Sequence, residues 1–167
     1  MDRQTLNGML KKLATAYTET LRKALGDRLV SVVLFGSVAR GEATPFSDID
    51  LLVVAEGLPR GRFARRGELK AADHAVEGEL LALHGEGIAA DFCIIVQDPE
   101  EAKGFKPLYL DFVEDALLLY DRGGFFADIL TQLRQRLQRL GARRLHLGKV
   151  RYWDLKPDIA PGEIFEL

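Results

Sequence analysis

The 167-residue sequence predicts a single α/β domain in which helices pack on a short β-sheet. Apolar residues recur with helical spacing over Arg3–Leu25 and again from Phe125 to Leu140. Between these segments lie short continuous apolar runs with the length of buried strands, as in Leu29–Phe35 and within Ser47–Val54. Glycine or proline residues separate the runs, as expected of elements that are joined by turns.

The first predicted helix, Arg3–Leu25, has one apolar face, which we expect to pack against the sheet. That face comprises Leu6, Met9, Leu10, Leu13, Tyr17, Leu21 and Leu25. Gly26 is expected to end the helix, because glycine readily adopts the backbone conformation found after a helix C-terminus. The first predicted strand, Leu29–Phe35, follows almost at once.

This strand stops at a Gly-Ser pair. Gly36 permits close approach of the backbone to a ligand, because it has no side chain. The hydroxyl of Ser37 and the following amides can hold a phosphate if Val38 begins a short helix. An ordinary turn from a strand to a helix is the alternative interpretation.

Two aspartates stand at the head of the second predicted strand, Ser47–Val54. Side chains alternate between the faces of a strand, so Asp48 and Asp50 are expected on the same face. Two adjacent carboxylates repel each other, and a hard cation such as Mg²⁺ removes that cost. Taken alone, so short and common a pattern more often reflects a turn-capping Asp48 and a solvated Asp50 at a strand edge.

The segment from Arg60 to Glu86 is predicted to be mainly helical, since apolar residues recur along it. Its arginines could contact a triphosphate or a nucleic acid, but a solvated helix start is the commoner origin of such a cluster. The next predicted strand is Ile88–Val96. A charge within this apolar run needs a partner or a function, so Asp91 is either a site residue or an edge-strand aspartate. Cys93 shares its face and is interpreted as a small core residue.

A helix over Leu108–Glu114, a strand over Ala116–Tyr120 and an amphipathic helix ending before Gly141 complete the predicted elements. From Arg122 through Lys156 there are nine Lys/Arg and two Asp/Glu, although the whole chain has a net charge of −2. The basic C-terminal helix and tail, about 124–167, is expected to be an extension of one domain covering 1–167. This charge suits an acidic partner or RNA, or it is a solvated helix face.

The composition is that of an ordinary globular protein, with 47% hydrophobic and 29% charged residues. A single cysteine excludes an internal disulfide and fits a reducing compartment. The N-terminal residues mix charges throughout, unlike a signal peptide, and the apolar runs are too short to span a membrane. We therefore expect a cytoplasmic protein without membrane segments.

The two motif strands and their connection resemble the signature of the minimal nucleotidyltransferases, members of the DNA polymerase β-like nucleotidyltransferase superfamily. The matching residues are Gly36-Ser37, Ala39-Arg40-Gly41 and Ser47-Asp48-Ile49-Asp50-Leu51. The resemblance covers about twenty residues and implies a nucleotidyltransferase (polymerase β palm-like) fold, with a short mixed β-sheet and helices packed on it. It also implies a third carboxylate on a later strand, for which Asp91 is the candidate.

The resemblance implies transfer of a nucleoside monophosphate from a nucleoside triphosphate, with release of pyrophosphate. ATP is the expected donor, with two Mg²⁺ ions as cofactors. The implied catalytic and metal-binding residues are Asp48, Asp50 and Asp91, and the implied nucleotide-binding residues are Gly36, Ser37, Arg40 and Ser47.

The same resemblance also implies which molecule accepts the AMP group. Small members of this superfamily are often antitoxins that pair with HEPN-domain toxins, and the chain has little beyond a catalytic core. A HEPN-type toxin is therefore the expected partner and AMP acceptor, and nucleic acid is less favoured. Two alternatives remain: a non-catalytic antitoxin that acts by binding, and a nucleotidyltransferase for a small molecule such as an aminoglycoside.

Overall fold

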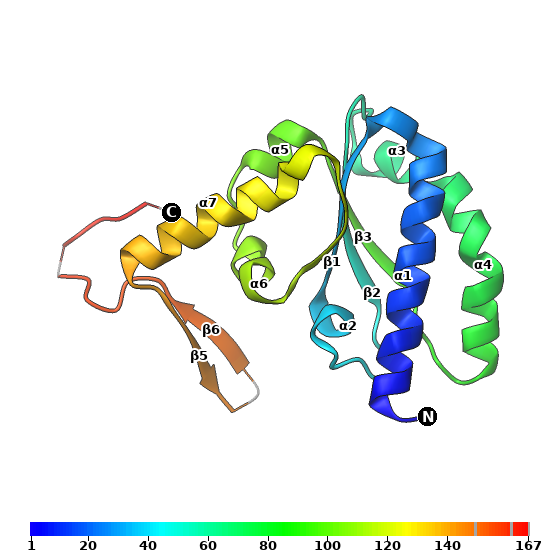
Figure 1. The fold of residues 1–167 in the computed structure, drawn as a ribbon, viewed down its shortest axis with the longest axis horizontal. Coiled ribbons are helices and arrows are strands. Elements are labelled where there is room, and N and C mark those ends of the chain that lie inside the picture. The colour runs from blue at the N-terminus through cyan, green and yellow to red at the C-terminus, as the bar shows by residue number, and fades with distance from the viewer. Residues whose placement is uncertain (149, 161, 167) are drawn as a thin grey trace.

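A four-stranded mixed sheet lies between two layers of helices (Figure 1) in the computed structural model, which describes residues 1–148, 150–160 and 162–166. The strands are β1 (Leu29–Phe35), β2 (Ile49–Ala55), β3 (Phe92–Gln97) and β4 (Leu117–Asp121). Their order is β3-β2-β1-β4; β1 runs antiparallel to β2 and β4, whereas β2 and β3 are parallel. The predicted α/β fold with a short mixed sheet is confirmed.

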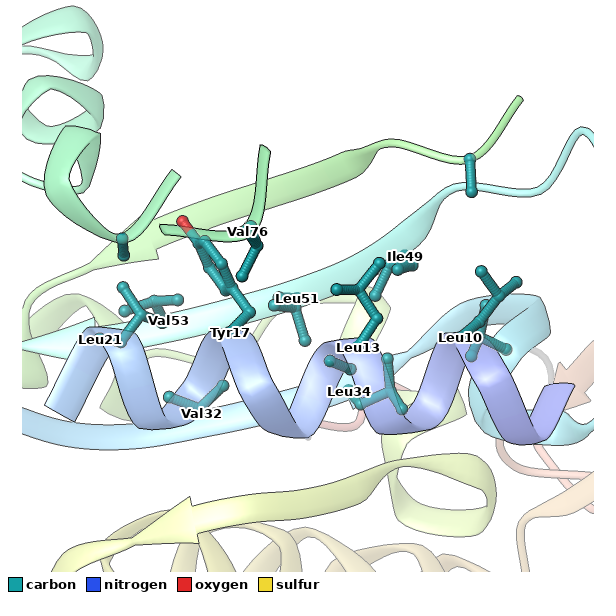
Figure 2. Close-up of a cluster of buried hydrophobic side chains, with 14 of the residues drawn as sticks. Leu10, Leu13, Tyr17, Leu21, Val32, Leu34, Ile49, Leu51, Val53 and Val76 are labelled. Atoms are coloured by element: carbon teal, nitrogen blue, oxygen red, sulfur yellow. The ribbon is translucent and has the colours of Figure 1, made fainter. Parts of the chain in front are cut away.

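Two helices, α1 (Arg3–Leu25) and α4 (Lys70–Gly85), cover one face of the sheet. Figure 2 shows Leu13 and Tyr17 of α1 pointing toward the strand residues of this core. Each fully buried aliphatic side chain here stabilises the fold by about 1.5–3 kcal/mol. The Tyr17 hydroxyl is not left unpaired, because it donates a hydrogen bond to Asp73 of α4 at 2.7 Å. The apolar face predicted for the first helix is the one that packs against the sheet.

The other face is covered by α6 (Leu108–Asp115) and α7 (Phe125–Leu140), with the short α5 (Pro99–Lys103) beside them (Figure 1). The Asp121 carboxylate fixes the start of α7 by accepting hydrogen bonds from the backbone N–H groups of Phe126 and Ala127, both at 2.9 Å. It also accepts one from the Ser31 hydroxyl of β1 at 2.6 Å. These bonds tie α7 to the sheet.

The last two strands, β5 (Arg143–Leu147) and β6 (Val150–Asp154), form an antiparallel hairpin apart from the main sheet (Figure 1). The hairpin was not predicted from the sequence, because only a tail was expected after the helix that ends before Gly141. Lys149, Pro161 and Leu167 of the predicted C-terminal extension lie outside the described residues. The short elements of the chain are α2 (Gly36–Arg40), α3 (Arg62–Gly67) and two single 3₁₀ turns, Gly26–Arg28 and Arg122–Gly124.

Two predicted boundaries were wrong by a few residues. The third strand begins at Phe92 rather than at Ile88, because the preceding backbone forms bonds outside the sheet. The N–H of Ile88 donates to Leu83 at the end of α4 at 3.0 Å, and that of Ala89 donates to Pro45 at 2.7 Å. The second strand likewise begins at Ile49, so both motif aspartates lie at the mouth of the sheet.

Within the described ranges, no helix is long and apolar enough to cross a membrane.

Candidate active site

Gly36 and Asp50 are in direct contact at the point where β1 ends and β2 begins. The antiparallel register places Phe35 opposite Asp50, which brings the next residue of the turn against the aspartate. Gly36 has a φ of +71°, and a Cβ atom built on it would lie 2.0 Å from Oδ2 of Asp50. Only glycine fits, both for its backbone conformation and for the space that the carboxylate occupies.

Asp50 is half-buried on the sheet face that α6 and α7 cover, whereas Asp48 is exposed just before the strand. Burial raises the pKa of the Asp50 carboxyl, and the charge of Asp48 adds to the increase. The Cys93 thiol and the positive charge of Arg40 act in the other direction. Asp48 and Asp50 together are called the acid pair. Their negative charges lie close together, and neighbouring groups of the protein compensate them only in part.

The backbone of Asp91 lies beside the acid pair. Its carbonyl accepts a hydrogen bond from the N–H of Ile49 at 2.7 Å, and the parallel register pairs Ile49 with Phe92. The Asp91 carboxylate is exposed and accepts a hydrogen bond from the N–H of Phe92 at 2.7 Å. Within the described part of the chain, no group of three His, Cys, Asp or Glu side chains is placed to hold a metal ion.

The residue of β3 that stands opposite Asp50 is Cys93. It is exposed rather than part of the core, so its interpretation as a core residue was wrong. Partial burial and the neighbouring Asp50 charge raise the pKa of its thiol, which keeps it protonated at neutral pH. Alternation along the strand had already placed it on the face of Asp91, and the register is what brings it to Asp50.

The remaining predicted site residues have local partners. The Ser47 hydroxyl accepts a hydrogen bond from the N–H of Thr44 at 2.9 Å, which closes the loop that leads to the acid pair. Ser37 accepts a bond from the N–H of Glu42 through its carbonyl at 2.8 Å. Nε of Arg40 donates to Oε2 of Glu42 at 2.9 Å. The structure therefore gathers Gly36, Ser37 and Arg40 on one turn against Asp50, while Ser47 supports the loop.

A small pocket of about 160 Å³ opens beside this turn. Phe35, Gly36 and Arg40 form one wall. Residues of α6 and its C-terminal end form the other, namely Leu108, Asp111, Phe112, Asp115 and Ala116. A larger hollow of about 710 Å³ lies between the α3 region and β3, but it contains none of the motif residues.

Several basic residues of the two arginine-rich segments form ion pairs within the chain. In the first, Arg65 pairs with Glu101 and Arg66 with Asp73, both at 2.5 Å. In the C-terminal third, ion pairs join Arg122 to Glu56, Arg144 to Asp115, Arg151 to Glu42 and Lys156 to Glu163. These contacts reduce the positive charge that either segment offers to a partner.

The acid pair fits a hard divalent cation. Both groups are carboxylates, and one is half-buried with a raised pKa. Arg40, whose charge reaches Asp50, forms its ion pair with Glu42 instead. Carboxylate oxygens that retain negative charge beside an anion-accepting turn are the ligands that Mg²⁺ prefers when it also binds phosphates.

The fold and the motif together are those of a nucleotidyltransferase enzyme. The chain belongs to the nucleotidyltransferase domain family, whose sequence model matches residues 18–165. It is 30% identical over 142 residues to the "Putative protein adenylyltransferase MJ1305" of Methanocaldococcus jannaschii. The aligned region covers 84% of this chain and 88% of that protein. The predicted family and enzyme class are confirmed.

Solved structures with a similar fold come from toxin–antitoxin complexes. One, described as a toxin–antitoxin with AMP-PNP, is 17% identical with a TM-score of 0.47, over 77% of this chain and 92% of that chain. Another comes from a complex of the tri-AMPylated HEPN toxin of Shewanella oneidensis with its MNT antitoxin. It is 15% identical with a TM-score of 0.45, over 79% of this chain and 92% of that chain.

Proposed function

We propose that this protein is a Mg²⁺-dependent adenylyltransferase that transfers AMP from ATP to a hydroxyl group of a HEPN-type toxin, and so acts as its antitoxin. The observation that carries the proposal is the packing of Gly36 against Asp50, which joins the phosphate-binding turn to the acid pair. A protein acceptor is supported by the archaeal relative that is named a protein adenylyltransferase. The HEPN partner is inferred from the resemblance of the motif.

The residues of the turn and the acid pair have separate roles in this proposal. Asp48 and Asp50 would hold Mg²⁺, and Asp91 is the expected third carboxylate, although in the described part of the chain no three such side chains are grouped to hold a metal ion. The Ser37 hydroxyl and the neighbouring amides bind the outgoing phosphates, and Arg40 adds positive charge to them. Ser47 keeps the loop in the conformation that presents Asp48.

The reaction is an in-line displacement at the α-phosphorus of ATP. A bond forms between the acceptor oxygen and this phosphorus, and the bond to the bridging oxygen of the β-phosphate breaks with its electron pair on pyrophosphate. Asp91 accepts the hydroxyl proton in this proposal, because its carboxylate is exposed and it directly precedes Phe92, the β3 residue that pairs with Ile49. Mg²⁺, when bound, supplies charge to the phosphates and lowers the pKa of the attacking hydroxyl.

The test is transfer of label from α-labelled ATP in the presence of Mg²⁺, with a co-expressed HEPN-type protein as the acceptor. We expect label on the acceptor with the wild type, and a loss of about 100-fold or more in the Asp48→Asn/Asp50→Asn double variant. Glu77→Gln, an exposed substitution on α4, is the matched control and should transfer at the wild-type rate.

Two outcomes would favour the alternatives. Stable capture of the HEPN-type protein without any label would indicate an antitoxin that acts by binding alone. Turnover with an isolated aminoglycoside, and none with the protein acceptor, would indicate a small-molecule nucleotidyltransferase. Label transfer that persists in the double variant would contradict the catalytic role of the acid pair.

A further inference from the structure

The Glu42 carboxylate connects the turn that contains Gly36, Ser37 and Arg40 to the C-terminal hairpin. Glu42 follows the turn directly, and its N–H donates to the Ser37 carbonyl at 2.8 Å. Its Oε2 accepts hydrogen bonds from Nε of Arg40 at 2.9 Å and from Nη1 of Arg151 at 3.1 Å. Its Oε1 accepts a further bond from Nη2 of Arg151. Arg151 lies on β6, 109 residues further along the chain.

The bond to Glu42 leaves the outer end of Arg40 available. Arg40 uses Nε for this bond, and in the described part of the chain its two terminal nitrogens donate to no protein acceptor. The side chain is 25% exposed and lines the pocket next to Gly36. Terminal guanidinium nitrogens are the groups that bind phosphate oxygens in pairs.

The arrangement depends on which arginine holds the Glu42 carboxylate. Arg151 occupies both oxygens of Glu42, whereas Arg40 shares only one of them. A glutamate released by Arg151 could bind the fork of Arg40 through both oxygens, since bidentate pairing is the stronger geometry. The terminal nitrogens of Arg40 would then face a carboxylate instead of a phosphate.

We propose that Arg151 is a positioning residue for the nucleotide: it holds Glu42 so that Arg40 presents its terminal nitrogens to the triphosphate of ATP. This inference rests on the proposed function. It makes the C-terminal hairpin part of the nucleotide site, although no residue of the hairpin belongs to the motif. The hairpin is anchored to α6 by a separate ion pair between Arg144 and Asp115, so the Arg151 contact can be removed while that anchor remains.

The test is the Kd for a non-hydrolysable ATP analogue with Mg²⁺, measured by calorimetry on the full chain. Arg151→Gln is expected to weaken binding by about fivefold to tenfold, the size of coupling found between residues of one ion-pair network. Arg143→Gln is the matched control, because it removes the same charge from the same hairpin at an exposed position. Its Kd should stay within about twofold of the wild type, as usual for surface changes.

Two double variants separate positioning from a structural role. In Arg40→Gln/Arg151→Gln, the second substitution should add nothing to the first, because Arg151 acts only through Arg40. In Glu42→Gln/Arg151→Gln, affinity should return to near the wild-type value, because a neutral amide no longer competes for the guanidinium. If Arg151→Gln acted only by weakening the attachment of the hairpin, neither result would be expected. The Tm of each variant measures such a loss of stability.

Additive losses in the Arg40 background, or a failure of Glu42→Gln to rescue, would overturn the role of Arg151 and leave the proposed function intact. A wild-type protein that does not bind the analogue with Mg²⁺ would overturn the proposed function, and this inference with it.

Discussion

The motif end of the main sheet and the C-terminal hairpin are built in opposite ways. At the motif end, Gly36 and Asp50 are held by paired central strands whose apolar residues, apart from the partly buried Phe35, are buried on both faces. The hairpin has exposed apolar side chains, Leu147 among them, and meets the body of the protein partly through the ion pairs of Arg144 and Arg151. Hydrophobic burial fixes the first region, and solvent-screened charges contribute to the position of the second.

The largest expected difference between the two regions is in stability. Leu51 of β2 is fully buried, so Leu51→Ala should lower the free energy of unfolding by about 2–5 kcal/mol through lost burial and a cavity. Leu147 of β5 is 74% exposed, and Leu147→Ala should change it by no more than about 0.5 kcal/mol. Urea denaturation of both variants measures the difference. Equal losses would mean that the hairpin belongs to the same packed core.

A pair of glycine variants separates backbone strain from the contact with Asp50. Gly36 and Gly41 both have positive φ, at +71° and +77°, so alanine at either position should cost about 1–2 kcal/mol of stability. A Cβ at Gly41 meets nothing within 4 Å, whereas one at Gly36 overlaps the Asp50 carboxylate. Gly36→Ala alone should therefore also abolish Mg²⁺-dependent ATP binding. Comparable binding by the two alanine variants would refute the close-contact interpretation.

The smallest expected effect concerns the pH dependence of the hairpin. Arg151 and Arg40 lower the pKa of Glu42 from 4.5 to about 2. Because the folded-state pKa is depressed, the contact is fully present above pH 4.5 and is lost as the pH falls through about 2. Trp153 on β6 is the single tryptophan, so its fluorescence reports the hairpin. In Arg151→Gln, the acid transition of this signal should move upward toward pH 4.5, whereas in Arg143→Gln it should stay in place.

The difference between the regions also explains what could be predicted from sequence. The Gly-Ser turn and the acid pair are close in the chain, and strand alternation is a local rule from which a shared face was predicted for both aspartates, although Asp48 lies just before β2. The prediction of a mixed sheet came from the family resemblance. The start of β3 was misplaced because Ile88 continues an apolar run, although its N–H bonds to the end of α4. That error placed Asp91 inside a strand instead of at its mouth.

The hairpin gave no comparable signal. Its strands, β5 and β6, have five residues each, and the face that meets the body of the protein combines the arginines Arg144 and Arg151 with Trp153. A pattern that relies on alternating apolar residues cannot detect such a face. The contact between Glu42 and Arg151 spans 109 residues, so only the folded chain reveals it. Cys93 was likewise placed opposite Asp50 by the register between strands, which the sequence does not specify.

The proposed function requires the acid pair beside Gly36 to bind the nucleotide through Mg²⁺. Calorimetric titration of an ATP analogue with and without Mg²⁺, on the wild type and on Asp50→Asn, tests it most directly. The substitution preserves size and removes a half-buried charge next to Asp48, so the Tm should not fall. We expect Mg²⁺-dependent binding by the wild type and a loss of about 100-fold or more in the variant. Equal, Mg²⁺-dependent affinities in the two proteins would contradict the claim.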